Sequence, residues 1–155
     1  MRVLPPDPGD PVIADSVVVH TDGAARGNPG PAGAGALVTT RDGDVLAEIA
    51  EPLGDTTNNV AEYTAAILGL ERAAELGAAQ VELRTDSQLL VHQLSGRYRV
   101  KAPHLRPLHE RVKDLVAGFD RVRFVHVPRE MNVEADRLAN LGVDLGLGGS
   151  PAGSR

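Results

Sequence analysis

The sequence predicts an α/β fold: a five-stranded mixed sheet, three antiparallel strands followed by two parallel ones, flanked by helices on both faces. β-branched segments of strand length fill the first third of the chain, and Asp42-Gly43 between two of them is a strong hairpin signal. Farther along, helical patterns alternate with two more short strands, which is typical of parallel crossover connections.

The first half of the chain supplies three strands and a long helix. Residues 16–22 (SVVVHTD) are β-branched and strand-like, and the turn-forming stretch GAARGNPGPAG follows them. Segments 33–40 and 45–52 are expected strands that flank the turn RDGD. A long helical pattern covers 58–76 and is ended by Gly77.

The second half alternates helices with the two remaining strands. Ser95-Gly96 ends the first of these helices, and Pro103 stands near the start of the second, a position that proline favours. In chain order we expect a strand at 81–85, a helix at 87–94, a helix at 103–116, a strand at 121–127 and a helix at 132–143.

The chain is expected to hold one domain, at residues 15–144. Its 155 residues and 16.3 kDa fit one domain with a sizeable core, and 42% of the residues are hydrophobic. Residues 1–14 are proline-rich and predict a flexible leader. Residues 145–155 (LGLGGSPAGSR) are rich in Gly, Ser and Pro, which is typical of a flexible tail or of a linker to a further domain.

Composition excludes several classes of protein. The chain has no cysteine, so disulfides and thiolate metal sites are excluded and any metal must be held by oxygen or imidazole. No apolar run reaches the ~18 residues of a membrane span. The proline-rich, acidic N-terminus is unlike a signal peptide. These features predict a cytoplasmic protein with no membrane partner.

The net charge of −5 argues at first against a nucleic-acid partner, but the charge is uneven. Residues 1–86 carry 5 basic and 14 acidic side chains, a net charge of −9, whereas residues 87–155 carry 11 basic and 7 acidic ones, a net charge of +4. One half can contact phosphates while the other concentrates carboxylates. Taken alone, this feature is also explained by an uneven surface without functional meaning.

Four acidic residues fall where such a fold can bring them together. Asp22 ends the first strand and Asp86 the fourth, so neighbouring parallel strands would present both carboxylates at the carboxyl edge of the sheet. Glu62 is expected in the first turn of the long helix, on a face continued by small residues. Asp136 is expected in the first turns of the last helix.

Each acid also has a purely structural interpretation. Asp22 could begin an Asp-Gly turn, Glu62 could complete a capping box, and Asp86 could cap the helix that follows it. Asp136 competes with Glu134, and helical periodicity does not separate the two. These interpretations predict no shared location for the acids, whereas a metal site does.

Gathered carboxylates point to a definite chemistry. Because carboxylates a few ångströms apart repel one another, some would stay protonated without a counter-charge. Mg²⁺ prefers oxygen ligands and is commonly held by a few carboxylates plus substrate phosphates. Two such ions about 3.5–4 Å apart can activate a water and stabilise the leaving oxygen of an in-line phosphoryl displacement. The acids therefore predict cleavage of phosphodiesters.

Four stretches of the chain resemble the motifs of the type 1 ribonuclease H family, in that family's order, and so imply its fold. They are TDGAARGNPGPAGAGAL (21–37), TTNNVAEYTA (56–65), TDSQLLV (85–91) and NVEADRLAN (132–140). The chain is most similar to the short archaeal-type branch, also found in actinobacteria, in which this module can precede a phosphatase-like domain.

The resemblance implies an endoribonuclease that hydrolyses the RNA strand of RNA–DNA hybrids with two metal ions and leaves 5′-phosphate and 3′-hydroxyl ends. It makes the four acids the ligands of Mg²⁺, with Mn²⁺ as a substitute, and it selects Asp136 over Glu134. The implied catalytic and metal-binding residues are Asp22, Glu62, Asp86 and Asp136. The implied substrate-binding residues are Gly23, Asn28, Thr57, Asn58, Asn59, Gln88, Arg97, Tyr98 and Lys101.

The resemblance implies a different role for each group of these substrate-binding residues. The amide side chains of Asn28, Asn58, Asn59 and Gln88 are expected to meet the hybrid's minor groove, where 2′-hydroxyls and base edges are displayed. Thr57 is expected to help seat a phosphate of the DNA strand. The glycines of the first motif, Gly23, Gly27 and Gly30, are expected to let the backbone approach the substrate.

The chain departs from the better-known bacterial form of the family at two places. The loop at 127–132 (VPREMN) is about four residues shorter and lacks the histidine that normally assists proton transfer and product release. Either Arg129 or Glu130 substitutes for it, or the activity is slower. The basic, tryptophan-containing substrate handle is reduced to 96–106 (GRYRVKAPHLR). Its Tyr98 either stacks on a sugar or base or is a partly buried residue of the fold.

The expected partner is an RNA–DNA hybrid, with double-stranded RNA as a further candidate, and a monomer is expected. The shortened loop leaves a second hypothesis open, a weakly active or non-catalytic module that binds hybrids or double-stranded RNA. Retention of all four acids argues against it, because a pure binder gains nothing from anions that face phosphates. A nuclease of the same fold that acts on DNA is a third hypothesis, which the Asn and Gln side chains disfavour.

Overall fold

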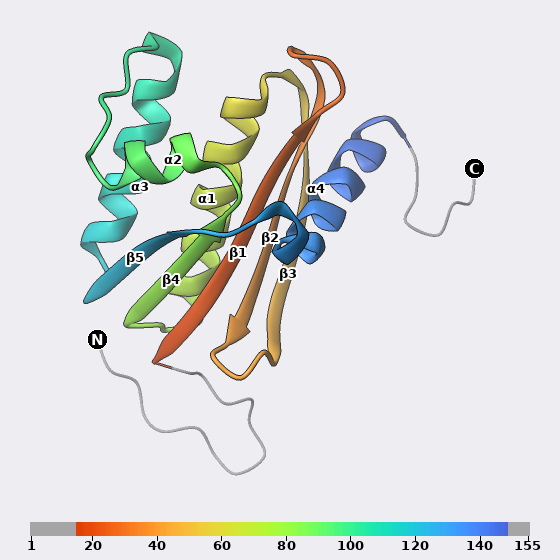
Figure 1. Cartoon of the computed structure of the whole chain (residues 1–155). Helices are drawn as coiled ribbons and strands as arrows, with labels where there is room; N and C mark the ends of the chain where they lie inside the picture. The colour runs from red at the N-terminus through yellow and green to blue at the C-terminus, as the bar shows by residue number, and fades with distance from the viewer. Residues whose placement is uncertain (1–14, 149–155) are drawn as a thin grey trace.

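The computed structural model describes residues 15–148, so the predictions for residues 1–14 and 149–155 lie outside the described residues. Five strands form one sheet in the order β3-β2-β1-β4-β5 (Figure 1). The strands are β1 (Ser16–Ala25), β2 (Gly30–Thr40), β3 (Val45–Thr56), β4 (Gln80–Thr85) and β5 (Arg121–His126). β1 pairs antiparallel with β2, and β2 with β3, whereas β1, β4 and β5 run parallel. The predicted mixed sheet is confirmed.

Helices cover both faces of this sheet, as predicted. α1 and α3 lie on one face and α4 on the other, where it packs against β1, β2 and β3 (Figure 1). The helices are α1 (Asn58–Glu75), α2 (Gln88–Leu94), η1 (Pro103–Leu105), α3 (Arg106–Ala117), η2 (Arg129–Met131) and α4 (Val133–Gly146). Over residues 15–148, none of these helices has the length and apolar character needed to cross a bilayer.

Glycines let both helix layers approach the central strands closely. A Cβ atom added at Gly69 of α1 would lie 2.4 Å from Cγ1 of Val19 in β1. On the other face, a Cβ added at Gly33 of β2 would lie 2.4 Å from the backbone oxygen of Ala139 in α4. Since atoms cannot approach so closely, only glycine fits at these crossings. The two helix layers are thereby held against the strands that carry the site.

Several element boundaries differ from the sequence-based expectation: β2 begins three residues earlier, at Gly30, and β3 ends four residues later, at Thr56. The stretch GAARGNPGPAG is not one long turn, because β1 continues to Ala25, which pairs with Ala32 of β2. Its small residues are required by helix packing as much as by turning. The helix expected at 103–116 is a 3₁₀ turn followed by α3, and the break falls beside Pro107, which cannot donate a backbone hydrogen bond.

The last helix ends three residues later than expected. α4 extends to Gly146, because it lies along the edge strand β3 and Gly146 still contacts Pro52 there. The backbone N–H of Leu147 donates to the carbonyl of Val143 and closes the last turn.

Candidate active site

A pocket opens where the parallel strands β1 and β4 end and where α1 and α4 begin. All four predicted acids line it, and they come from four different elements or their ends. The lining residues are Asp22, Gly23, Ala24, Ala25, Arg26, Asn58, Glu62, Asp86, Arg129, Asp136 and Asn140. We call this the carboxylate pocket.

Asp22 lies inside β1 and not in a turn. It is opposite Gly35 of β2 in the antiparallel register, and its side chain is on the face that α4 covers. Only 7% of the residue is exposed. The backbone N–H of Gly23 donates to Oδ1 of Asp22 at 3.0 Å. The interpretation of Asp22 as the start of an Asp-Gly turn is therefore wrong.

Glu62 is held close to Asp22 by the packing of α1 on β1. It is the fifth residue of α1, in the second turn and not the first. The helix is capped by Thr57, whose hydroxyl accepts from the N–H of Val60 at 3.2 Å, so the capping box expected for Glu62 does not exist. A Cβ added at Gly23 would lie 2.4 Å from the backbone N of Glu62. The glycine therefore sets how near α1 comes to β1.

Asp86 follows β4 directly and leaves the capping of the next helix to its neighbour. The hydroxyl of Ser87 accepts from the N–H of Leu90 at 3.1 Å and is the N-cap of α2. Ser87 also hydrogen bonds to the side chain of Glu62. The interpretation of Asp86 as a helix cap is therefore wrong. The carboxylate of Asp86 makes no capping hydrogen bond and lines the carboxylate pocket.

The structure separates Asp136 from its rival Glu134. Asp136 lines the carboxylate pocket, and the side-chain amide of Asn140 donates to its backbone oxygen at 3.0 Å and to Oδ1 at 3.4 Å. Glu134 lies outside this pocket, and its Oε1 accepts from Nε of Arg137 at 3.1 Å. Asp136 is therefore the acid of α4 that can act together with the other three.

Burial and mutual repulsion raise the pKa of two carboxyl groups in the pocket. Burial, the charge of Asp86, a hydrogen bond with Asp136 and the charges of Asp136 and Glu62 together raise the pKa of Asp22 to about 8. Burial and the charge of Asp86 raise the pKa of Glu62 to about 7, against the opposing hydrogen bond from Ser87. The pocket therefore favours a positive ligand.

The donor set fits a hard divalent cation, in an open arrangement. Carboxylate oxygens are the ligands that Mg²⁺ prefers. Among residues 15–148, however, no three His, Asp or Glu side chains stand in the arrangement of a complete metal site. The carboxylates are neighbours, since the charges of nearby acids contribute to the raised pKa values of Asp22 and Glu62. Mg²⁺ commonly completes its coordination with water and substrate phosphates.

Of the substrate-binding residues predicted in the first three motifs, Gly23 and Asn58 line this pocket. The backbone N–H of Asn58 donates to Oδ1 of Asn28 at 3.0 Å, which joins the β1–β2 turn to the start of α1. Asn59 and Gln88 are exposed on the first turns of α1 and α2. Thr57 accepts a hydrogen bond as the N-cap, while its hydroxyl proton stays available for another acceptor.

The predicted glycines have reasons within the fold. Gly23 is needed for the approach of α1 to β1, Gly27 has a φ of +102°, and a Cβ at Gly30 would lie 2.2 Å from the backbone oxygen of Arg26. The structure thus explains why glycine stands at each position. Their approach to a substrate stays a prediction.

The reduced handle lies apart from the carboxylate pocket. Arg97, Tyr98 and Lys101 are exposed in the connection between α2 and η1, and none lines the carboxylate pocket. Tyr98 is 53% exposed, and its ring lies 4.6 Å from the ring of His92. It is therefore a surface residue packed on one side only.

Three further residues of the site escaped prediction. Arg26 lines the pocket and forms a 2.8 Å ion pair with Asp144. Asn140 orients Asp136 from one helical turn away, a spacing that could have marked it. Asn132 is buried, and its side chain donates to the carbonyl of Thr21 beside Asp22, which no local pattern indicates.

The two loop residues that were candidates to replace the missing histidine lie in different pockets. Arg129 lines the carboxylate pocket, whereas Glu130 lines a different hollow, beside His20 and Leu37. Arg129 forms no ion pair with any residue in the part of the chain that the structure describes. Its guanidinium is thus available to an anion in the carboxylate pocket.

A five-stranded mixed sheet of this order, with acids gathered at the carboxyl ends of its parallel strands, defines the ribonuclease H-like class of α/β proteins. Comparison with known proteins agrees. The family model described as reverse transcriptase-like matches residues 20–142. Ribonuclease HI of Halobacterium salinarum is 45% identical over 142 residues, which cover 92% of this chain and 69% of that protein. The chain belongs to the ribonuclease H family.

Solved structures and a longer relative extend this result. The N-terminal RNase H domain of Rv2228c from Mycobacterium tuberculosis superposes with a TM-score of 0.83 at 47% identity, covering 86% of this chain and 96% of that one. LC11-RNase H1 in complex with an RNA/DNA hybrid gives a TM-score of 0.80 at 42% identity, covering 84% and 99%. The mycobacterial bifunctional protein Rv2228c is 49% identical over 129 residues, which cover 83% of this chain but only 35% of that protein.

Proposed function

We propose that this chain hydrolyses the RNA strand of RNA–DNA hybrids and leaves 5′-phosphate and 3′-hydroxyl ends. The observation that carries the proposal is the convergence of four carboxylates on one pocket, where the pKa of Asp22 is raised to about 8 and that of Glu62 to about 7. The hybrid bound by the LC11 relative supports the choice of substrate.

The residues that would hold divalent cations are Asp22, Glu62, Asp86 and Asp136, with two ions when substrate is bound and Mg²⁺ or Mn²⁺ as the metal. Bound cations would supply Lewis-acid activation of water and of the scissile phosphate, together with charge for the leaving oxygen. The protein's part is to hold the acids in place. Asn140 orients Asp136, and Gly23 lets α1 bring Glu62 to the sheet.

Arg129 is proposed to bind a non-bridging phosphate oxygen in the pocket. A guanidinium stays protonated in proteins, so Arg129 cannot pass a proton on as a histidine would. It can offer charge and paired hydrogen bonds to the phosphate as negative charge develops in the transition state. The missing histidine is therefore replaced in its electrostatic role only, and proton transfer is left to water.

The amide side chains around the pocket are proposed to select the hybrid. Asn58 lies in the pocket wall. The side-chain oxygen of Asn28 accepts a hydrogen bond from the N–H of Asn58, and the two amide protons of Asn28 are left for another acceptor. Together with the exposed Asn59 and Gln88, these groups can pair with 2′-hydroxyls and base edges in a minor groove. Thr57 would donate its hydroxyl proton to a phosphate of the DNA strand.

Beyond the pocket, Arg97, Tyr98 and Lys101 are proposed to contact the hybrid as a small basic handle. The exposure of all three supports this. The chain is proposed to act as a monomer in the cytoplasm. The bifunctional relative supports the proposal that this module can be joined to a second, phosphatase-like domain.

Parallel digestion of three labelled duplexes tests the function: an RNA–DNA hybrid, double-stranded RNA and double-stranded DNA, each with Mg²⁺ and with Mn²⁺. We expect cleavage of the hybrid's RNA strand, with loss of activity in EDTA and in Asp86→Asn. Activity that survives EDTA would exclude a metal-dependent mechanism. Tight hybrid binding without cleavage, even in Mn²⁺, would show a non-catalytic binding module, and cleavage of double-stranded DNA would show a DNA nuclease.

A further inference from the structure

A second pocket lies at the end of the sheet opposite the carboxylates. It forms where β1, β4 and β5 begin, beside the turn between β2 and β3. Three arginines line it, Arg41, Arg121 and Arg123, together with one acid, Glu82. We call this the distal basic pocket. It is about 20 Å from the carboxylate pocket, the length of the six residues of β1 that separate the two.

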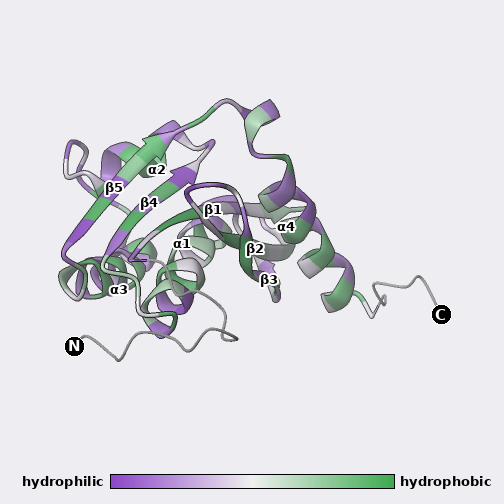
Figure 2. Ribbon diagram, turned by 90° about the horizontal axis from the view of Figure 1, so that it is seen from below, coloured by the Kyte–Doolittle hydropathy of each residue, from purple (hydrophilic) through white to green (hydrophobic). Residues whose placement is uncertain are grey.

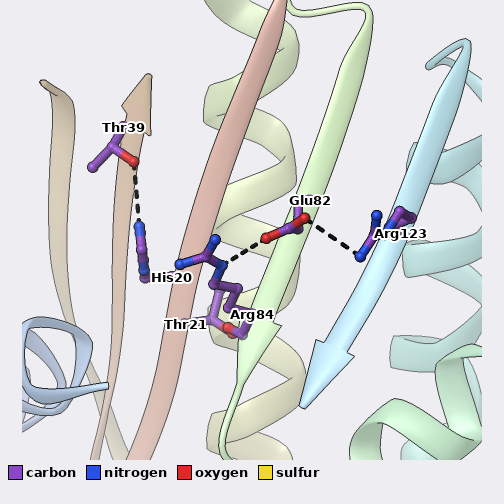
Figure 3. A network of polar contacts seen from close by, with 6 residues as sticks. All are labelled: His20, Thr21, Thr39, Glu82, Arg84 and Arg123. Atoms are coloured by element: carbon purple, nitrogen blue, oxygen red, sulfur yellow. Dashed lines mark hydrogen bonds and ion pairs between the residues drawn. The ribbon is translucent and has the colours of Figure 1, made fainter. Parts of the chain in front are cut away.

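The positive charge of this pocket is only partly neutralised by the described residues. Within residues 15–148, Arg41 and Arg121 form no ion pair and no side-chain hydrogen bond. Glu82 is shared by two arginines, because its Oε2 accepts from Nε of Arg84 at 2.7 Å and its Oε1 lies 3.7 Å from Nη2 of Arg123 (Figure 3). Three guanidinium groups thus share the pocket with one carboxylate.

Arg121 and Arg123 lie on the half of the sheet face that no helix of residues 15–148 covers. Hydrophobic and hydrophilic residues alternate along β4 (Figure 2): Val81 and Leu83 enter the core beside α1, while Glu82 and Arg84 point the other way. Arg123 follows the same alternation on β5, and its side chain is 59% exposed. Since α4 packs on β1, β2 and β3, this part of the face is open to a ligand.

Two uncharged side chains add hydrogen-bonding groups to the lining of the pocket. Ser16 and Gln80 line the pocket with a hydroxyl and an amide. On the same face, Nε2 of His20 lies 3.2 Å from Oγ1 of Thr39, and burial and the Arg84 guanidinium lower the pKa of His20 (Figure 3). His20 does not line the distal basic pocket.

The lining chemistry favours a phosphate over a protein surface. None of the large hydrophobic residues exposed in the described chain lines this pocket, so it offers no apolar anchor for a folded partner. It also holds no aromatic ring on which a base could stack. Guanidinium groups match the geometry of phosphate oxygens and bind them in pairs of hydrogen bonds. Such a site would bind the nucleic-acid backbone without reading its sequence.

We propose that the distal basic pocket is a second phosphate-binding site, which holds the backbone of a nucleic acid at a distance from the carboxylate pocket. This proposal rests on the proposed function in one respect only, the identification of the bound polyanion as a nucleic acid. That polyanion is either a single-stranded extension of the substrate or a separate strand, and the chemistry at the pocket is the same for both.

Binding of a DNA single strand by the full chain tests the site, because this measurement does not depend on cleavage. Fluorescence anisotropy would follow a labelled DNA single strand of mixed sequence over a series of sodium chloride concentrations at constant Mg²⁺. Each phosphate contact contributes about 0.7 to the slope of log K against log salt for single strands, so Arg41→Gln/Arg121→Gln should lower the slope by about 1.4. Equal slopes for this variant and the wild type would overturn the proposal.

Two further variants control for charge and folding. Arg72→Gln/Lys113→Gln removes the same charge from exposed residues of α1 and α3, and its slope should equal that of the wild type. Gln80→Glu keeps every arginine but adds a carboxylate to the pocket, and it should also weaken strand binding. A loss as large in the α1/α3 variant would show that only net charge matters, which contradicts a defined site.

Cleavage kinetics distinguish the two sources of the polyanion. If the substrate's own extension occupies the pocket, Arg41→Gln/Arg121→Gln raises KM several-fold for a hybrid with a single-stranded extension and leaves KM for a short blunt hybrid unchanged. If a separate strand occupies it, both KM values stay unchanged while the slope still falls. A third outcome is that the variant loses binding of polyglutamate while its binding of the DNA strand is unaffected. That result would assign the pocket to an acidic protein segment instead. Absence of hybrid cleavage by the wild type would refute the proposed function alone.

Discussion

The side-chain amide of Asn132 donates a hydrogen bond to the backbone carbonyl of Thr21 at 2.9 Å. Thr21 directly precedes Asp22 in β1, and Asn132 is the N-cap residue of α4, four positions before Asp136. Both Thr21 and Asn132 are buried. This hydrogen bond therefore fixes how the elements that carry two of the four acids lie relative to each other.

Asn132→Ala should weaken both the fold and the reaction. Removal of the amide leaves the buried carbonyl of Thr21 without its partner, which costs about 1–3 kcal/mol of unfolding free energy. Urea denaturation would measure this loss, with the exposed Asn59→Ala as the stability control. Because Asp136 loses its anchor, kcat should fall as well. A destabilised but folded variant with wild-type kcat would contradict the positioning role.

Gly23→Ala should displace Glu62. The added Cβ would lie 2.4 Å from the backbone of Ala61 and Glu62, so α1 must shift away from β1. Such overpacking costs about 1–3 kcal/mol or more, and cleavage should fall with it. Gly118→Ala is the matched control, since its Cβ would meet only the backbone oxygen of Leu115 at 3.4 Å. Equal melting temperatures and rates for the two variants would refute this account.

In EDTA, stability should fall as pH rises from about 4 to about 8. The pKa of Asp22 is raised from 3.8 to about 8 and that of Glu62 from 4.5 to about 7, so the folded state keeps protons that the unfolded chain releases. The stabilisation is complete at low pH and is lost as pH passes the folded-state values. Thermal melts would show Asp22→Asn above the wild type at pH 8 and level with it near pH 4. The same decline in both proteins would contradict the assignment to Asp22.

Mg²⁺ should raise the melting temperature more at pH 8 than at pH 6. At the lower pH a cation must displace protons from Asp22 and Glu62 before it binds. A ligand at about 100 times its Kd stabilises by about 2.7 kcal/mol, which is a shift of several degrees. Asp86→Asn should lose most of this shift. A shift that does not depend on pH would show that the cation binds elsewhere.

Arg129→Ala should lower kcat more than it raises KM for the hybrid, whereas Glu130→Ala should change neither. Only the arginine lines the carboxylate pocket, and one donor aimed at a transition state is typically worth about 10²–10³-fold in kcat. Because a guanidinium does not titrate, the pH profile of kcat should keep its shape in Arg129→Lys. A changed profile would show that Arg129 takes part in proton transfer.

The elements of this fold and three of its acids were predictable because their signals are local. β-branched strands, the Asp42-Gly43 turn and the glycine after α1 each act over a few residues, and they sufficed for the mixed sheet. Asp22 and Asp86 were predictable as neighbours, since parallel strands that end together share one edge. The fourth acid needed the family resemblance, because helical periodicity treats Glu134 and Asp136 alike.

Only the tertiary structure decided the features that depend on partners far apart in sequence. The continuation of β1 to Ala25 depends on pairing with β2, and the buried place of Asn132 depends on the carbonyl of Thr21. The position of Arg129 in the carboxylate pocket likewise emerges only when the chain is folded, as does the lack of ion pairs at Arg41 and Arg121 within residues 15–148. Local sequence determines which backbone conformation each segment prefers, whereas burial and charge at a site depend on which segments pack together.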